Sequence, residues 1–259
     1  MSTPEAERPR GVQSVDRALD ILELLAGHQS TMGVTEIARE VGLAPGTTHR
    51  LLVALARRGW VRQDPGRRYG VGLAARRLGD ASGAQLATLA VPALRAAVEL
   101  TEETANLASL DGDVMVYVAQ APSPHTLRIF AEVGRRVPLH STAVGKVVLA
   151  RMEPARAMDM LTRPGVELRA RTPRTLTDLD DLRAELDRVR EQGYALDDEE
   201  MELGVRCVAV PVASGALGSL ALSVSGPTER MTRERAVAAV PGLRQIAADL
   251  AERSLGATA

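Results

Sequence analysis

The segment at residues 33–60, "GVTEIAREVGLAPGTTHRLLVALARRGW", decides the fold of the first part of the chain. Its apolar stripes recur at three- and four-residue spacing in two short runs: Val34, Ile37, Ala38 and Val41, then Thr48, Leu51, Leu52 and Leu55. Such spacing predicts two short amphipathic helices. Gly42 ends the first run, and Pro45 suits the first turn of the second helix. Two short helices joined by a turn that contains glycine predict a helix-turn-helix.

Two short apolar segments follow this pair of helices. They are "GWVRQD" at residues 59–64 and "RRYGVG" at residues 67–72, and Pro65 and Gly66 lie between them. Short segments of this kind around a Pro-Gly turn predict a β-hairpin. A hairpin directly after the second helix is the wing of a winged helix-turn-helix.

Positive charge is concentrated in the same region. Residues 43–77 hold eight arginines against the single acid Asp64, whereas residues 78–259 hold twenty basic and twenty-five acidic residues. A basic patch on an otherwise acidic chain is typical of a nucleic-acid-binding surface, and a solvated helix face is the alternative. Six of the arginines fall on the second helix and the wing, which favours DNA. The predicted DNA-contacting residues are Thr47, Thr48, His49, Arg50, Arg57, Arg67 and Arg68.

The remaining pattern divides the chain into four parts. Residues 1–11 form a polar, flexible tail, and residues 12–72 form the winged helix-turn-helix, whose first helix we expect to begin at an N-cap on Ser14 and to end before Gly27. Residues 73–85 form a linker helix, with a domain boundary near Gly83. Residues 86–259 form a second domain for effector binding and oligomerisation.

The second domain mixes helices and strands. The apolar pattern predicts helices over residues 86–101, 141–152, 179–192 and 233–253. It predicts strands at "DVMVYVAQ", "LRIFAEV", "VRCVAVPV" and "GSLALSVS". Strands and helices in this order indicate an α+β fold in which helices cover an antiparallel sheet.

Residues 139–146, "LHSTAVGK", contain the only lysine among the chain's 32 basic residues. Ser141 or Thr142 would cap the following helix, and the free N–H groups of Ala143, Val144 and Gly145 would attract an anion. Lys146 would add a mobile positive charge one turn inside the helix. The alternative is that the hydroxyl only caps the helix and that Lys146 extends into solvent.

Three further features favour a small polar ligand. Asp197 belongs to an acidic run on a predicted loop, and one carboxylate could turn inward to a ligand, although such a run is more often a solvated turn. Ser223 and Ser225 share one face of their strand, which could be the floor of a polar pocket or an exposed face. Cys207 reads as a small core residue on the residues alone.

Composition and motifs argue against several classes of protein. Apolar residues are 45% and charged residues 25% of the chain, which is typical of a folded domain. The single cysteine excludes an intrachain disulfide, and the four histidines have no metal-ligand spacing, so we expect no metal and no cofactor. No nucleophile elbow or phosphate loop is present, and we expect no enzyme; a thiol redox domain on Cys207 is the alternative. We expect a cytoplasmic protein without a membrane segment.

Several of these motifs together resemble the IclR family of bacterial transcriptional regulators. They are "GVQSVDRALDILELL", "TTHRLLVAL", "LHSTAVGKVVLA", "GYALDDEEMELGVRCVAVPV" and "LALSVSGP". The resemblance implies a winged helix-turn-helix, a linker helix and a GAF-like effector domain, in dimers or dimers of dimers on double-stranded operator DNA. It implies that Ala143, Val144, Gly145, Asp197, Cys207, Ser223 and Ser225 line the effector pocket. The helix start Thr142-Ala143-Val144 departs from the smaller, glycine-containing start of relatives that bind 2-oxo acids.

The sequence therefore predicts a ligand-responsive regulator that binds DNA. We expect a repressor of a catabolic or metabolic operon, with a small carboxylate-bearing metabolite as effector. The alternative is a DNA-binding regulator whose C-terminal domain only oligomerises or binds a protein partner.

Overall fold

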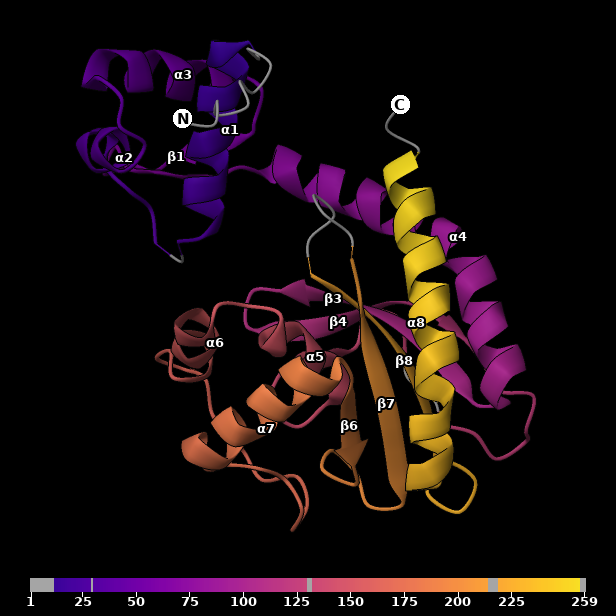
Figure 1. The fold of residues 1–259 in the computed structure, drawn as a ribbon. Helices are drawn as coiled ribbons and strands as arrows, with labels where there is room; N and C mark the ends of the chain where they lie inside the picture. The colour runs from indigo at the N-terminus through magenta and orange to yellow at the C-terminus, as the bar shows by residue number, and fades with distance from the viewer. Residues whose placement is uncertain (1–11, 29, 130–131, 214–218, 257–259) are drawn as a thin grey trace, which may run out of the picture. The chain divides into compact units, whose positions relative to one another are not determined.

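The computed structural model describes residues 12–28, 30–129, 132–213 and 219–256 (Figure 1). The chain divides into two compact units, Met1–Gly83 and Ala84–Ala259. One continuous helix, α4 at Leu73–Thr101, covers both the predicted linker helix and the helix predicted after it. None of the described helices is long and apolar enough to cross a membrane.

The N-terminal unit is a winged helix-turn-helix, as the sequence predicts. It contains α1 at Gln13–Ala26, α2 at Val34–Glu40, α3 at Pro45–Arg57, and an antiparallel hairpin of β1 at Val61–Gln63 and β2 at Tyr69–Val71. Its small core consists of Ile21, Leu25, Met32, Ile37, Leu52, Val61 and Tyr69. The core takes residues from each helix and from both strands, so the helices and the wing fold as one unit.

The ends of α1 show where local signals hold and where they fail. Gly27 caps the C-terminus as predicted, because its N–H donates to the carbonyl groups of Glu23 and Leu25. The N-cap prediction is wrong: the helix starts one residue before Ser14, with Val12 at the cap and no side chain bonded there. Ser14 therefore lies inside the first turn.

The C-terminal unit is built on one antiparallel sheet of six strands. These are β3 at Thr104–Asp111, β4 at Val114–Ala121, β5 at Arg136–Pro138, β6 at Ala195–Asp198, β7 at Val205–Val212 and β8 at Leu220–Pro227. Their order across the sheet is β5-β4-β3-β8-β7-β6. Strands from both ends of this domain's sequence therefore meet at the β3–β8 pair in the middle.

Both faces of the sheet are covered (Figure 1). Leu222 and Val224 of β8 pack with α4 and α8, which spans Arg233–Gly256. Ala221 packs on the opposite side with α5 at Ala143–Ala150, α6 at Pro154–Leu161 and α7 at Leu179–Gln192. The alternation in "LALSVSGP" thus separates two cores, and of the two interpretations of the serine face the exposed one is wrong, because this face is buried under α5.

Four elements differ from the sequence prediction. "LRIFAEV" is not a strand over residues 127–129 and 132–133, and its residues 130–131 lie outside the described part; the edge strand is β5 instead. The strand β3 was not predicted because "TANLASLD" is poor in the β-branched and aromatic residues that strands favour. Asp197 and Asp198 lie in strand β6 rather than in a loop, since they pair with Cys207 and Arg206. The helix α6 was not predicted either.

Candidate functional site

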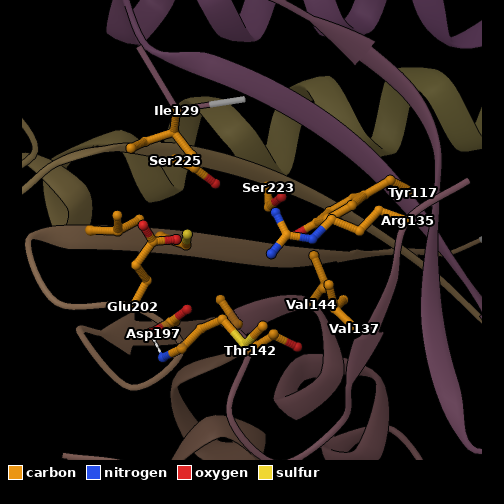
Figure 2. Close-up of a pocket in the computed structure, with 14 residues that line it drawn as sticks. Tyr117, Ile129, Arg135, Val137, Thr142, Val144, Asp197, Glu202, Ser223 and Ser225 are labelled. Carbon is orange, nitrogen blue, oxygen red and sulfur yellow. Dashed lines mark hydrogen bonds between the residues drawn. The ribbon is translucent and has the colours of Figure 1, made fainter. Parts of the chain in front are cut away.

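A cavity lies between the sheet and the start of α5 in the C-terminal unit (Figure 2). Its walls come from β4 to β8, the α5 start and the loops at residues 129, 135 and 201–202; they are Tyr117, Ile129, Arg135, Val137, Thr142, Ala143, Val144, Asp197, Met201, Glu202, Val205, Cys207, Ser223 and Ser225. The cavity volume open to the centres of water-sized spheres is about 40 Å³. The cavity therefore suits a small ligand.

The start of α5 forms one wall of the cavity. Thr142 is the N-cap: its Oγ1 accepts from the Gly145 N–H at 3.2 Å and donates to the Pro138 carbonyl at 2.7 Å. The N–H groups of Ala143 and Val144 have no place in the helical ladder, and both residues line the cavity. This helix start can therefore attract an anion, as predicted from the sequence.

Gly145 serves packing rather than ligand access. A Cβ atom there would lie 2.3 Å from the Leu139 carbonyl oxygen, which is too close for any other residue without a backbone shift. Gly145 is also not among the lining residues. The expectation that it lets a ligand approach the backbone is therefore replaced by a close contact between the helix start and the preceding segment.

Lys146 is held inside the protein by two carboxylates. Its side chain is 1% exposed, and its Nζ lies 2.5 Å from Glu200 Oε1 and 3.1 Å from Glu185 Oε1. The side chain does not line the cavity. The structure thus corrects both expectations for Lys146, since the ammonium neither faces the cavity nor extends into solvent. A compact ammonium with three donors suits a buried position between two acids.

The floor of the cavity is a row of polar side chains across three strands. Asp197 on β6 pairs with Cys207 on β7, which pairs with Ser225 on β8. Side chains opposite each other in a sheet point to the same face, so all three reach the cavity. Ser223 lies two residues before Ser225 on that face. The structure therefore brings together six of the eight predicted effector residues and leaves out Gly145 and Lys146.

Burial changes the acid-base behaviour of this floor. Desolvation raises the pKa of Asp197 from 3.8 to about 7, against the lowering effect of hydrogen bonds from the backbone N–H groups of Met201 at 3.1 Å and Glu200 at 2.8 Å. The Asp197 carboxyl can therefore donate or accept a hydrogen bond near neutral pH. Burial also raises the pKa of the Cys207 thiol, which keeps it protonated and disfavours thiol chemistry.

The sequence did not single out Arg135, which is the one basic residue in the cavity wall among the residues that the structure describes. Its guanidinium points toward Ser223 (Figure 2). Arg135 lies between Gly134, whose φ is +89°, and the short edge strand β5. A glycine turn before an arginine was a weak signal, and the incorrect strand prediction over residues 127–133 obscured it. Tyr117, on β4, was missed as well.

The predicted DNA-contacting residues of α3 fall into two groups. His49, Arg50 and Arg57 are exposed, and Thr47 is partly exposed. Thr48 is fully buried, and its Oγ1 donates to the Ala44 carbonyl at 3.2 Å. Thr48 therefore belongs to the core, as the apolar stripe suggested, and its expected contact with DNA is corrected.

The two wing arginines also differ from each other, because one is exposed and the other is hydrogen-bonded within the protein. Arg67 is exposed at the turn of the hairpin with φ of +57°. The Arg68 guanidinium donates to the Thr31 carbonyl at 2.7 and 3.0 Å and to Glu36 Oε2 at 2.9 Å. Arg68 therefore ties the wing to the start of α2, while 45% of its side chain stays exposed, and its contact with phosphate stays a prediction.

Comparisons with known proteins agree over both units. Residues 14–65 match the IclR helix-turn-helix domain, and residues 80–252 match the bacterial transcriptional regulator IclR C-terminal domain. The HTH-type transcriptional regulator BhcR of Paracoccus denitrificans is 42% identical over 236 residues, which cover 89% of this chain and 83% of that protein. The transcriptional repressor IclR of Escherichia coli is 34% identical over 231 residues, covering 86% and 83%.

A solved structure supports the same assignment. The crystal structure of the Thermotoga maritima IclR matches with a TM-score of 0.62 at 27% identity, covering 94% of this chain and 99% of that chain. The match includes the helix-turn-helix, which implies DNA binding. On the fold, the cavity and these matches together, the chain belongs to the IclR family of bacterial transcriptional regulators.

Proposed function

We propose that the protein is a repressor whose binding to operator DNA is controlled by a small carboxylate-bearing metabolite in the cavity beneath α5. The observation that carries this proposal is the cavity itself, which combines a free helix start, the Asp197 carboxyl and the arginine Arg135. A relative of 34% identity is named a transcriptional repressor, which supports this direction of control.

The chemistry of the cavity favours an organic acid. The N–H groups of Ala143 and Val144 and the Arg135 guanidinium are all donors, and both the helix start and the arginine carry positive charge. Asp197 can hydrogen-bond to a hydroxyl or carbonyl group of the same ligand. The small volume favours a metabolite of a few carbon atoms.

The exposed arginines of the N-terminal unit support contact with DNA. His49 and Arg50 on α3 would reach base edges in the major groove, and Arg57 and the wing residue Arg67 would hold phosphates. We propose that the protein works as a homodimer or a dimer of dimers. The metabolite would then shift the population of dimers whose two α3 helices fit one operator, because it binds the two states with different affinity.

Thermal unfolding against a panel of acids tests whether the cavity binds such a ligand. The panel would contain pyruvate, glycolate, gluconate, 2-oxoglutarate and 4-hydroxybenzoate. A ligand at 100 times its dissociation constant adds about 2.7 kcal/mol to the free energy of unfolding. For a protein of this size we expect the melting temperature to rise by several degrees, since each kcal/mol shifts it by roughly 2 to 4 °C.

A matched pair of variants connects the shift to the cavity. Arg135→Ala removes the cation that lines the cavity, whereas Arg136→Ala removes its neighbour, which pairs with Asp111 at 2.7 Å outside the cavity. We expect the shift to disappear in Arg135→Ala and to persist in Arg136→Ala. An equal shift in both variants contradicts binding in this cavity. No shift with any acid favours the alternative that this domain only oligomerises.

A further inference from the structure

The polar floor of the cavity continues onto β3. Asn106 on β3 pairs with Ser223 on β8, so the two side chains share one face of the sheet. The neighbours Ala105 and Leu107 pack into the core under α4 and α8, while Ala108 packs into the core under α5. Asn106 therefore lies on the α5 side, one strand beyond Ser223.

Asn106 and Ser223 both carry buried polar atoms without a partner. The Asn106 Nδ2 and the Ser223 Oγ have no hydrogen-bond partner among the described residues, although the two residues are 0% and 1% exposed. Most buried polar groups in proteins have a partner, so two such atoms on adjacent strands, one of them in the wall of the cavity and the other directly beside it, need an explanation. Thr142 and Asp197, which are also buried at this site, are paired, and the other described atom without a partner is Glu200 Oε2.

The orientation of the Asn106 amide is fixed by its neighbour on β4. Gln120 Nε2 donates to Asn106 Oδ1 at 3.0 Å. The oxygen of the amide is therefore occupied, and its N–H₂ group is the part that remains available. An N–H₂ group can only donate, so the missing partner is an acceptor.

We propose that Asn106 is an effector-binding residue, and that its amide and the Ser223 hydroxyl donate hydrogen bonds to the carboxylate of the ligand. This proposal rests on the function proposed above. The Arg135 guanidinium points toward the same serine (Figure 2), and Asn106 pairs with that serine on the neighbouring strand. The acids Asp197 and Glu202 lie on the other side of the cavity in the same view.

This arrangement also gives the ligand a direction. Its carboxylate lies at the β3–β8 end, and Asp197 lies on β6, two strands from β8. Adjacent strands are about 4.8 Å apart, so the backbones that carry the two ends are roughly 10 Å apart. Because side chains from both strands reach into one small cavity, the ligand class is a small carboxylic acid that also carries a hydroxyl or carbonyl group.

The test compares ligand binding and ligand-free stability in two variants of Asn106. Asn106→Leu removes both polar atoms at similar volume, and Asn106→Asp keeps the acceptor for Gln120 but replaces the donor with a negative charge. Ser109→Ala is the control, because Ser109 is a small polar residue of the same strand whose side chain points away from α5. Binding is measured by calorimetry with the acid of the panel that stabilises the wild-type protein most.

We expect both Asn106 variants to bind the acid at least about tenfold more weakly, as for a lost hydrogen bond to a charged group, and Ser109→Ala to bind it normally. Without the acid, Asn106→Asp keeps the acceptor of Gln120, whereas Asn106→Leu removes both the unpaired donor and that acceptor, so thermal unfolding of each variant shows separately what the change does to the fold. Wild-type affinity in both Asn106 variants would overturn this subsite and leave the proposed function intact. If the wild type binds no acid, the proposed function fails and the subsite fails with it.

Discussion

At the scale of single residues, Asp197 gives a prediction about pH. Its pKa is raised from 3.8 to about 7, so between these values the folded protein holds a proton that the unfolded chain has lost. This contribution to stability is complete below pH 3.8 and is lost as the pH rises to about 7 and above. Each pH unit in this window costs up to about 1.4 kcal/mol.

We expect Asp197→Asn to remove this loss, since an amide does not titrate and its oxygen can still accept from Glu200 and Met201. Urea unfolding of the wild type and the variant at pH 5 and pH 8 measures the difference. The pKa of His140 is lowered by burial, so its contribution is lost as the pH falls, in the opposite direction and equally in both proteins. An unchanged pH dependence in Asp197→Asn contradicts the raised pKa.

Lys146 gives a prediction about stability. Lys146→Met leaves Glu200 and Glu185 without the cation between them, in a place where their side chains are only 9% and 12% exposed. Removing one partner of a buried ion pair typically destabilises a protein by about 3 to 5 kcal/mol. We expect a loss of this size in urea unfolding, and a partial recovery when Glu200→Gln is added. A loss below about 1 kcal/mol, with no recovery, contradicts the buried pair.

These residues show what the sequence could not predict. The sequence shows that Lys146 is the only lysine. Its partners Glu185 and Glu200 are 39 and 54 residues away along the chain, and no local pattern connects them to it. Ala143, Val144, Asp197, Cys207, Ser223 and Ser225 were found because family motifs and strand alternation place them. Arg135 required the sheet order, which brings the start of β5 to the cavity, and Asn106 required the pairing of β3 with β8.

At the scale of elements, we expect α3 to contact the bases of DNA and the wing to contact its phosphates. Arg50→Ala on α3 should abolish the preference for operator over random DNA, because a base contact carries sequence information. Arg67→Ala at the wing should weaken binding to all DNA and reduce the salt dependence by about one phosphate contact. Fluorescence anisotropy on both kinds of DNA at several salt concentrations separates the two. Equal losses on operator and random DNA for Arg50→Ala contradict its role.

Arg68 on the wing can be compared with Arg50 and Arg67, because its side chain is bonded within the protein. Its guanidinium is engaged with Thr31 and Glu36, so Arg68→Ala should lower the stability of the wing more than it changes the salt dependence. A half-exposed pair of this kind contributes about 1 kcal/mol or less. A salt dependence reduced as much as in Arg67→Ala would show that Arg68 binds phosphate instead.

Elements with strong periodicity were predicted well, and those with weak periodicity were not. The helix α7 and the strand β7 have the predicted bounds, because an amphipathic stripe and an apolar run bounded by loops mark them. The strand β6 contains two aspartates, which strands rarely hold, and becomes a strand only by pairing with β7. Tertiary pairing therefore decided the elements that local preference left open.

At the scale of the whole molecule, control of DNA binding by a ligand requires two units to act together. The cavity lies in the unit Ala84–Ala259, the exposed arginines lie in Met1–Gly83, and α4 is the helix that continues from one to the other. A ligand can change DNA binding only if it binds two states of the protein with different affinity. The expected coupling is about 5- to 150-fold in the affinity for DNA.

The most direct test is the affinity for operator DNA with and without the acid that stabilises the protein, measured by fluorescence anisotropy on DNA selected by the protein itself. We expect saturating acid to weaken operator binding at least about fivefold in the wild type and in Arg136→Ala, but not in Arg135→Ala. Operator affinity that stays the same while the acid is bound in the cavity would contradict control of DNA binding by this site.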